Sequence, residues 1–137
     1  GAGGSEGAFD QGRGEQEDLQ AVMAWVSDQW PGRSVALAGF SFGSYVSAAV
    51  ANRIKVDFLV SIAPAVDRWG YDVLTGIACP WWVVFGDQDE VVSVASMRDF
   101  VNRPPSPLVA AEIPGASHFF HGKLMDLRDV LLDIISV

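Results

Sequence analysis

The chain has 137 residues, of which 50% are hydrophobic and 19% charged, a balance typical of one soluble globular domain rather than of a disordered or coiled-coil protein. Its 17 acidic and 9 basic side chains give a net charge of −8, which argues against a nucleic-acid partner and against binding to an anionic membrane surface. A single cysteine, Cys79, excludes an internal disulfide and fits a cytoplasmic location, and no apolar run reaches the length of a membrane span.

Glycines crowd residues 1–13, which predicts an irregular connection there. Apolar residues at helical spacing then extend from about Gly14 to Trp30, where Pro31-Gly32 ends the predicted helix. A Gly-x-Gly in this region is a weak phosphate-loop signal, because no strand precedes it and no P-loop lysine follows. Since the chain opens without Met on a turn-rich segment, we expect residues 1–137 to form a single α/β domain truncated at its N-terminal side.

Apolar runs of strand length alternate with helical segments along the rest of the chain. This order predicts an α/β fold in which a parallel sheet of about four strands is flanked by helices and connected by right-handed crossovers. Residues 65–79 interrupt the alternation as a short irregular or partly helical segment. The expected strands are 34–39, 56–63, 81–85 and 108–113, and the expected helices after the first are 42–53, 93–102 and 123–135.

The first expected strand runs into Gly39-Phe40-Ser41-Phe42-Gly43, a Gly-x-Ser-x-Gly pattern at a strand-to-helix turn. This pattern is typical of a nucleophile elbow, where strained backbone exposes the serine, although alone it also fits an ordinary glycine-rich turn. Both glycines are expected where strand and helix approach too closely for a Cβ atom. Phe42 opens the helix, so its backbone N–H is predicted to point at an oxyanion forming beside Ser41.

Carboxylates and histidines follow the third and fourth strands. Sites in parallel α/β sheets gather at the carboxyl ends of strands, where this chain places Asp87 and Asp89, then His118 and His121. Together with Ser41 they give the order Ser, Asp, His, which is the chain order of α/β-hydrolases. We predict Ser41 as nucleophile, His118 as the base that takes its proton and Asp89 as the residue that orients the imidazole. Asp87 remains an alternative, and each residue taken singly could be an ordinary turn or loop residue.

Four segments of the chain together resemble the C-terminal part of the small, lidless serine α/β-hydrolases, a group similar to dienelactone hydrolases and short esterases. The segments are GAGGSEGAFDQGRGEQEDL, LAGFSFGSYV, GDQDEVV and GASHFFHG. The resemblance implies an acid three residues after the strand-terminal glycine, which is Asp89, and a base in a Gly-x-x-His pattern, which is His118. It also implies that residues 65–79 stand where larger relatives insert a lid, and hence that the substrate is small or accessible. Members have further strands upstream, one of which pairs beside the elbow strand and is followed by a loop that supplies a second oxyanion donor.

These features predict a serine hydrolase that cleaves a carboxylic ester, thioester or related acyl bond of a small molecule through an acyl-enzyme intermediate. We expect no cofactor and no metal, because the histidines and carboxylates lack a ligand pattern such as His-x-x-x-His. Trp69, Tyr71, Phe119 and Phe120 are candidates for an acyl pocket, although buried aromatic residues more often belong to a core.

A second interpretation is a catalytically silent, hydrolase-like domain that acts as an interaction or assembly module. Without upstream strands, the strand at 34–39 would be an unpaired sheet edge, so a homo-oligomer through that edge is expected. The oxyanion hole would also lack its second donor, a loss of about 100- to 1000-fold in turnover. A third interpretation, a flavodoxin-like binding domain, shares the parallel sheet but leaves the placement of Ser, Asp and His as coincidence.

Overall fold

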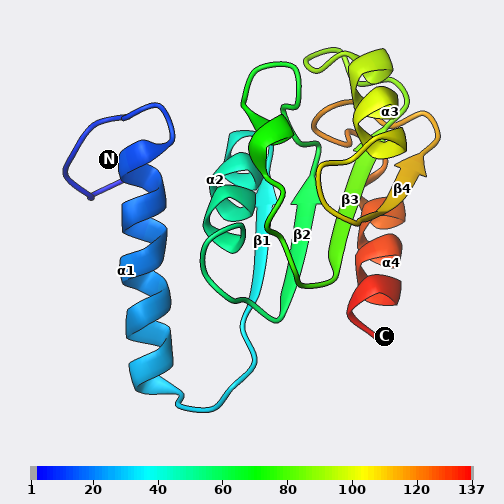
Figure 1. The fold of residues 1–137 in the computed structure, drawn as a ribbon. Coiled ribbons are helices and arrows are strands. Elements are labelled where there is room, and N and C mark those ends of the chain that lie inside the picture. The colour runs from blue at the N-terminus through cyan, green and yellow to red at the C-terminus, as the bar shows by residue number, and fades with distance from the viewer. Residues whose placement is uncertain (1–2, 137) are drawn as a thin grey trace.

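A parallel sheet forms the centre of the computed structural model, which describes residues 3–136 (Figure 1). Within these residues the sheet has four strands in the order β1-β2-β3-β4, and each neighbouring pair is parallel. The predicted fold class is therefore confirmed. The strands are β1 (Ala36–Phe40), β2 (Phe58–Ile62), β3 (Trp81–Gly86) and β4 (Val109–Ile113).

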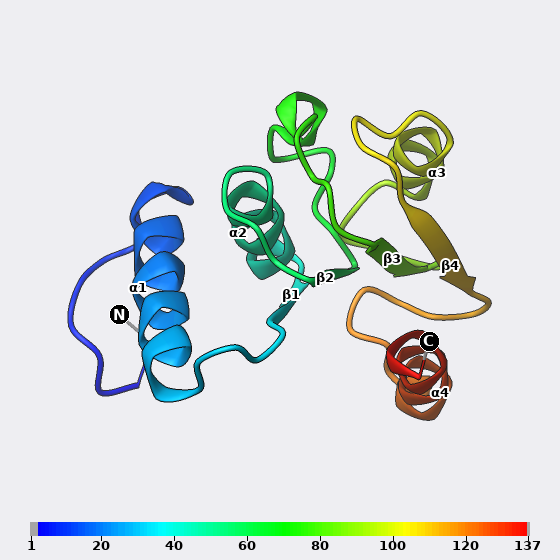
Figure 2. The ribbon, with the colours of Figure 1, turned by 60° about the horizontal axis from the view of Figure 1, so that its bottom comes forward.

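Helices cover both faces of the sheet (Figure 2). Helices α2 and α3 lie over one face and α4 over the other, while α1 stands beside α2 at the β1 side. The predicted partly helical segment at 65–79 contains one short 3-10 helix, η1 (Tyr71–Val73). The helices are α1 (Arg13–Gln29), α2 (Phe42–Ala51), α3 (Val94–Asn102) and α4 (Leu124–Ile135).

The two central strands are apolar along their length because both of their faces are covered. Leu59 and Val83 face the cluster that α2 and α3 close, and Val60 and Val84 face the cluster that α4 closes. Such doubly covered strands are typical of parallel sheets. The first two strands are shorter than expected at their starts, where the Val35 N–H instead donates to the Asp57 carboxylate at 2.7 Å and the Asp57 N–H donates to the Val35 carbonyl at 2.9 Å.

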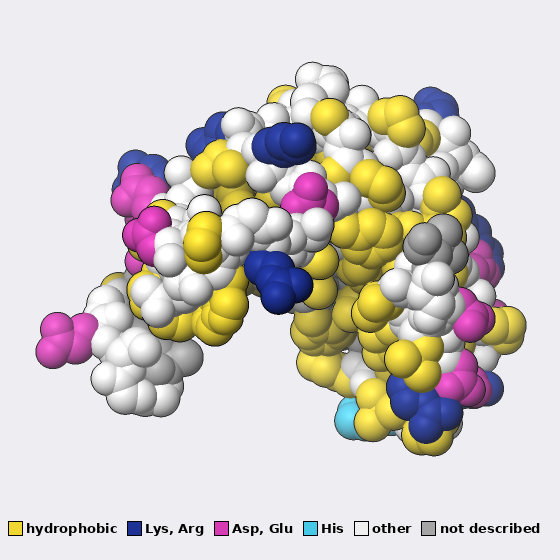
Figure 3. All heavy atoms as spheres, turned by 90° about the horizontal axis from the view of Figure 1, so that it is seen from below, with side chains coloured by type: hydrophobic (Ala, Val, Ile, Leu, Met, Phe, Trp, Pro, Cys, Tyr) yellow, Lys and Arg dark blue, Asp and Glu magenta, His cyan; other side chains and the backbone are white. Residues whose placement is uncertain are grey.

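Helix α1 is packed on one side only. None of its residues, all within the described range, is buried, and Val22 and Trp25 are each 55% exposed. Leu19 and Met23 pack against the core beside α2, so the predicted apolar stripe is only partly covered. Seen from below the view of Figure 1, hydrophobic side chains line a hollow between the N-terminal part of the chain and the part around α4 (Figure 3).

Across residues 3–136, no helix combines the length and the apolar character that a membrane crossing needs.

Candidate active site

Ser41 occupies the sharp turn between β1 and α2, as the sequence predicts. Its backbone has φ 51° and ψ −115°, a conformation that residues other than glycine rarely adopt. The Ser41 N–H donates to the Ile62 carbonyl at 2.8 Å. A hydrogen bond from the end of β1 to the end of β2 therefore holds the strained residue in place. Strain of this kind at a strand end is a property of nucleophile elbows.

The structure gives a steric reason for glycine at one of the two positions in the Gly-x-Ser-x-Gly pattern and not at the other. A Cβ at Gly39 would lie 2.3 Å from the Gly43 carbonyl oxygen, so strand and helix do approach too closely there for any other residue. A Cβ at Gly43 would meet nothing within 4 Å outside its own helix. The close-approach explanation is thus confirmed for Gly39 and wrong for Gly43, because Gly43 contributes its backbone, and not its missing side chain, to the contact.

The structure brings the three predicted residues into one hydrogen-bonded chain. His118 Nε2 lies 3.0 Å from Ser41 Oγ, and His118 Nδ1 lies 2.7 Å from Asp89 Oδ2. A carboxylate can only accept, so Nδ1 carries the hydrogen, and in the neutral ring Nε2 is left to accept the Ser41 hydroxyl proton. The imidazole is 2% exposed and the Asp89 carboxylate 3% exposed, which strengthens their interaction by excluding water.

Asp89 and Asp87, which the sequence left as alternatives, lie in different environments. The second oxygen of Asp89 accepts the N–H groups of Val91 and Val92, both at 2.8 Å, so the turn holds this carboxylate while its other oxygen faces His118. Asp87 instead accepts the Gly115 N–H at 2.6 Å and ties the β3 end to the loop after β4. Asp89 is therefore the acid in contact with His118.

The loop that carries His118 is fixed by backbone contacts. The His118 N–H donates to Glu90 Oε2 at 3.0 Å, and a Cβ at Gly86 would lie 2.0 Å from the Ala116 carbonyl oxygen. Phe120, 1% exposed and at φ 54°, anchors the loop in the core below α4 rather than in a pocket. The other histidine, His121, is exposed, and its ring lies 6.0 Å from that of Phe119.

The N-terminus of α2 lies directly beside the nucleophile. Phe42 is the first helical residue, and the first N–H groups of a helix have no partner within the helix. The positive end of the helix dipole adds to the attraction for negative charge at this position. These groups suit an oxyanion that forms on a substrate bound at Ser41.

Aromatic rings stand on two sides of Ser41. On one side, the Phe42 ring lies 4.9 Å from Trp69 and 5.3 Å from Phe9. On the other side, the Phe40 ring lies 5.1 Å from the His118 ring and 5.7 Å from that of Phe119, which is 52% exposed. The predicted pocket residues therefore do not line one pocket.

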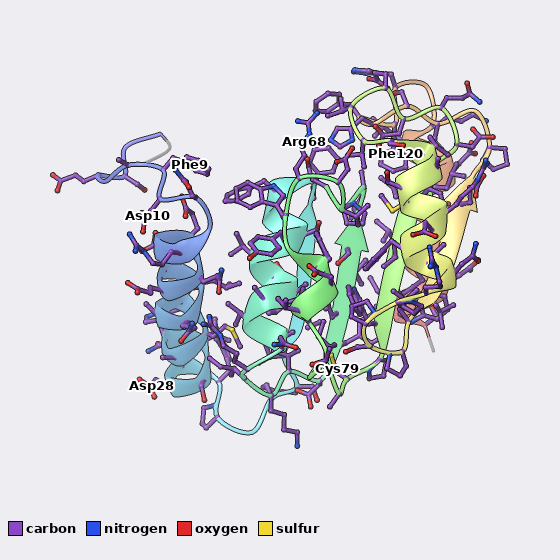
Figure 4. The ribbon with its side chains drawn as sticks, turned by 45° about the horizontal axis from the view of Figure 1, so that its top comes forward. Phe9, Asp10, Asp28, Arg68, Cys79 and Phe120 are labelled. Atoms are coloured by element: carbon purple, nitrogen blue, oxygen red, sulfur yellow. The ribbon has the colours of Figure 1, made fainter. Side chains whose placement is uncertain are left out.

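Trp69 and Tyr71 line a cavity of about 720 Å³ between residues 66–72 and α3. Tyr71 is only 2% exposed, and its hydroxyl lies 2.7 Å from Ser44 Oγ. Segment 65–79 is fixed over this side of the sheet, because Arg68 Nη2 donates to the Val91 carbonyl at 2.8 Å. Figure 4 shows Arg68 and Phe120 at the carboxyl edge of the sheet, with Cys79 toward the opposite edge.

Sequence reasoning missed the contacts made by Glu90, Ser44 and the Tyr71 hydroxyl. Glu90 could have been suspected from its position next to Asp89, and Ser44 from its spacing of three residues from Ser41 at a helix start. Nothing in the sequence signals that Tyr71 reaches Ser44. Within residues 3–136, no three His, Cys, Asp or Glu side chains are arranged to hold a metal ion.

Comparisons with known proteins identify the family and the fold. The sequence pattern of the family described as X-Pro dipeptidyl-peptidase (S15 family) matches residues 1–109. An α/β serine hydrolase homologue from Coxiella burnetii has 50% sequence identity and a TM-score of 0.93, over 97% of this chain and 64% of that one. A serine hydrolase without lid from Xanthomonas campestris has 43% identity and a TM-score of 0.88, over 94% of this chain and 59% of that one.

An uncharacterized protein of Rickettsia prowazekii is 30% identical over 98% of this chain and 61% of its own length. The resemblance to lidless serine α/β-hydrolases is confirmed by these matches. The chain spans about three fifths of the length of each of these relatives.

Proposed function

The chain belongs to the X-Pro dipeptidyl-peptidase (S15) family and has the fold of an α/β serine hydrolase, and from that premise we propose that it cleaves an acyl bond through an acyl-enzyme intermediate. One observation carries the proposal, the chain of hydrogen bonds from Ser41 Oγ through the His118 ring to Asp89. A serine whose hydroxyl meets a buried histidine and aspartate in this geometry is arranged to act as an activated nucleophile.

The steps follow from which atoms can accept protons. Ser41 Oγ attacks the acyl carbonyl carbon while its proton moves to His118 Nε2, and the carbonyl oxygen becomes an oxyanion beside the Phe42 N–H. The imidazolium gives the proton to the leaving group as the acyl bond breaks, which leaves an ester on Ser41. A water molecule then attacks this ester while His118 Nε2 takes one of its protons, and the imidazolium returns that proton to Ser41 Oγ as the acid product leaves. Asp89 stabilises the imidazolium at each stage.

The substrate class we propose is a small carboxylic ester or thioester. The Phe40 and Phe119 rings beside His118 and the Phe42 and Trp69 rings beyond Ser41 offer apolar surface to an acyl or leaving group. The family name describes peptidases, and an amide bond is attacked by the same steps. A single cysteine supports the further proposal of a reducing, cytoplasmic location.

Hydrolysis of p-nitrophenyl acetate and butyrate, measured beside an X-Pro p-nitroanilide, tests this function. We expect the esters to be cleaved, and we expect Ser41→Ala and His118→Ala each to reduce kcat by at least about 1000-fold, as triad losses do. His121→Ala is the matched control, since this exposed histidine lies in the same loop, and it should leave kcat unchanged. Equal activity in wild type and Ser41→Ala would contradict the proposal.

A second candidate function, an assembly module, is favoured by the state of β1. Within residues 3–136, β1 pairs with β2 and with no other strand, so the backbone groups of its outer side have no strand to bond. Such an edge recruits another strand. We propose that a second copy of this chain pairs with the edge at 34–39, which gives a homo-oligomer.

A further inference from the structure

Ser44 and Tyr71 form a buried pair of hydroxyl groups directly behind the elbow. Ser44 is 0% exposed and Tyr71 is 2% exposed. Ser44 Oγ lies 2.6 Å from the Ser41 carbonyl oxygen and 2.7 Å from the Tyr71 hydroxyl. The carbonyl can only accept, so it takes the one hydrogen of the Ser44 hydroxyl. The Tyr71 hydroxyl must therefore be the donor to Ser44 Oγ.

Burial also keeps the Tyr71 proton in place. Desolvation raises the pKa of Tyr71 well above the usual range of a phenol, so its hydroxyl remains a donor at any physiological pH. The ring is held from two sides, 5.6 Å from the ring of Tyr45 and 5.4 Å from that of Phe100. The end of η1 is held too, because Ser106 Oγ donates to the Leu74 carbonyl at 2.7 Å.

The carbonyl at the end of this relay belongs to the peptide group that matters most to the proposed chemistry. The Ser41 C=O and the Phe42 N–H are the two ends of one planar peptide unit. That carbonyl also accepts the Ser44 backbone N–H at 3.1 Å, so two donors act on it. Hydrogen bonds at the oxygen polarise the unit and make the N–H at its other end a stronger donor.

We propose that Ser44 and Tyr71 are positioning residues that fix and polarise the Ser41–Phe42 peptide, so that the Phe42 N–H is aimed at the substrate oxyanion. This inference rests on the proposed hydrolase function. It gives segment 65–79 a role, because that segment supplies Tyr71 and thereby connects the surface over α2 with the oxyanion donor. The strained φ of 51° at Ser41 explains why such a clamp is needed.

The first test compares three single variants in ester hydrolysis. Tyr71→Phe removes one hydroxyl and keeps the ring, and Ser44→Ala removes the other. Each should lower kcat by about tenfold with KM unchanged, well short of the about 100- to 1000-fold effect of deleting an oxyanion donor. The double variant should lose little more than Ser44→Ala alone, because both act through one relay. Tyr45→Phe is the matched control and should leave kcat unchanged, since Tyr45 stacks its ring on Trp69 in the same cluster.

The second test does not depend on turnover. In ¹H–¹⁵N spectra of the wild-type chain, the Phe42 amide reports the polarisation of its peptide unit. Tyr71→Phe and Ser44→Ala should move the ¹⁵N and ¹H resonances of Phe42 upfield, and Tyr45→Phe should leave them in place. The same spectra show whether each variant is folded.

The two tests separate the relay from the hydrolase proposal. If the wild-type chain hydrolyses no ester, the proposed function fails, while the Phe42 shift still decides whether the relay polarises the peptide. If the wild-type chain is active, unchanged kcat in folded Tyr71→Phe overturns the positioning role, and an unmoved Phe42 resonance overturns its mechanism.

Discussion

Gly39 and Gly43 flank the nucleophile symmetrically in sequence, yet alanine at the two positions should have opposite effects on stability. The Cβ of Gly39→Ala would lie 2.3 Å from the Gly43 carbonyl oxygen, 2.5 Å from its carbon and 2.6 Å from Ser44 Cα. All three are backbone atoms, so no side chain can rotate away. Because carbon–oxygen contacts normally lie at about 3.3 Å or more, the start of α2 would have to retreat by about 1 Å.

A forced shift of this kind in a packed region costs about 1–3 kcal/mol or more. Gly43→Ala meets no atom within 4 Å beyond its own helix and replaces a flexible residue in the first turn of α2, so it should be neutral or stabilising by up to about 1 kcal/mol. The free energies of unfolding of the two variants should therefore differ by about 1–4 kcal/mol, with Gly43→Ala the more stable.

Equilibrium unfolding in urea, followed by tryptophan fluorescence and far-UV circular dichroism, measures both values. The wild-type chain and both variants are compared at one pH and one protein concentration. A Gly39→Ala chain as stable as wild type would refute the close-approach argument. A Gly43→Ala chain destabilised as much as Gly39→Ala would refute the claim that only one of the two glycines is sterically required.

Three further predictions follow from buried or unpaired groups. Burial raises the pKa of Tyr71, so above a pH of about 10 the unfolded chain loses the Tyr71 proton while the folded chain keeps it. The free energy of unfolding should therefore fall by up to about 1.4 kcal/mol for each unit by which the pH rises. Urea unfolding from pH 9 to 11 should show a shallower fall for Tyr71→Phe than for wild type, and parallel curves would contradict this. Glu90→Ala leaves the His118 backbone N–H without its acceptor and should lower the free energy of unfolding by about 1 kcal/mol. Glu90→Gln keeps an acceptor and should lower it less. Equal decreases for the two variants in urea unfolding would count against the contact. Sedimentation velocity should show self-association that is weakened by Ala38→Pro, which removes a backbone donor from the outer side of β1, and is unaffected by Ala110→Pro on the outer side of β4. A wild-type monomer at all concentrations would argue against assembly through β1.

The fold was predictable because the apolar runs are strong signals. Residues 58–62 and 81–85 are long enough for strands and too short for helices, and each is followed by a clear break. The packing of α1 was not predictable, since an apolar stripe indicates one covered face and says nothing about how much of that face another element reaches. Trp25 and Trp30 are accordingly about half exposed.

The candidate site was predictable where it depends on strand ends, and not where it depends on tertiary contact. Ser41, Asp89 and His118 each follow a strand, so their meeting at one edge of the sheet follows from topology. The difference between Asp87 and Asp89 depends on local contacts: two N–H groups of the turn bind the Asp89 carboxylate, while an N–H of the loop after β4 binds that of Asp87. The contact between Ser44 and Tyr71 joins residues 27 positions apart and could only come from the structure.

The most direct test of the account is covalent labelling of the wild-type chain with a fluorophosphonate, read by intact mass and by peptide mapping. If His118 and Asp89 activate Ser41, the chain should gain one adduct, located on Ser41. Labelling should disappear in Ser41→Ala, slow strongly in His118→Ala and persist in His121→Ala. A folded wild-type chain that gains no adduct, or an adduct on any other residue, would contradict the assignment of Ser41 as the nucleophile.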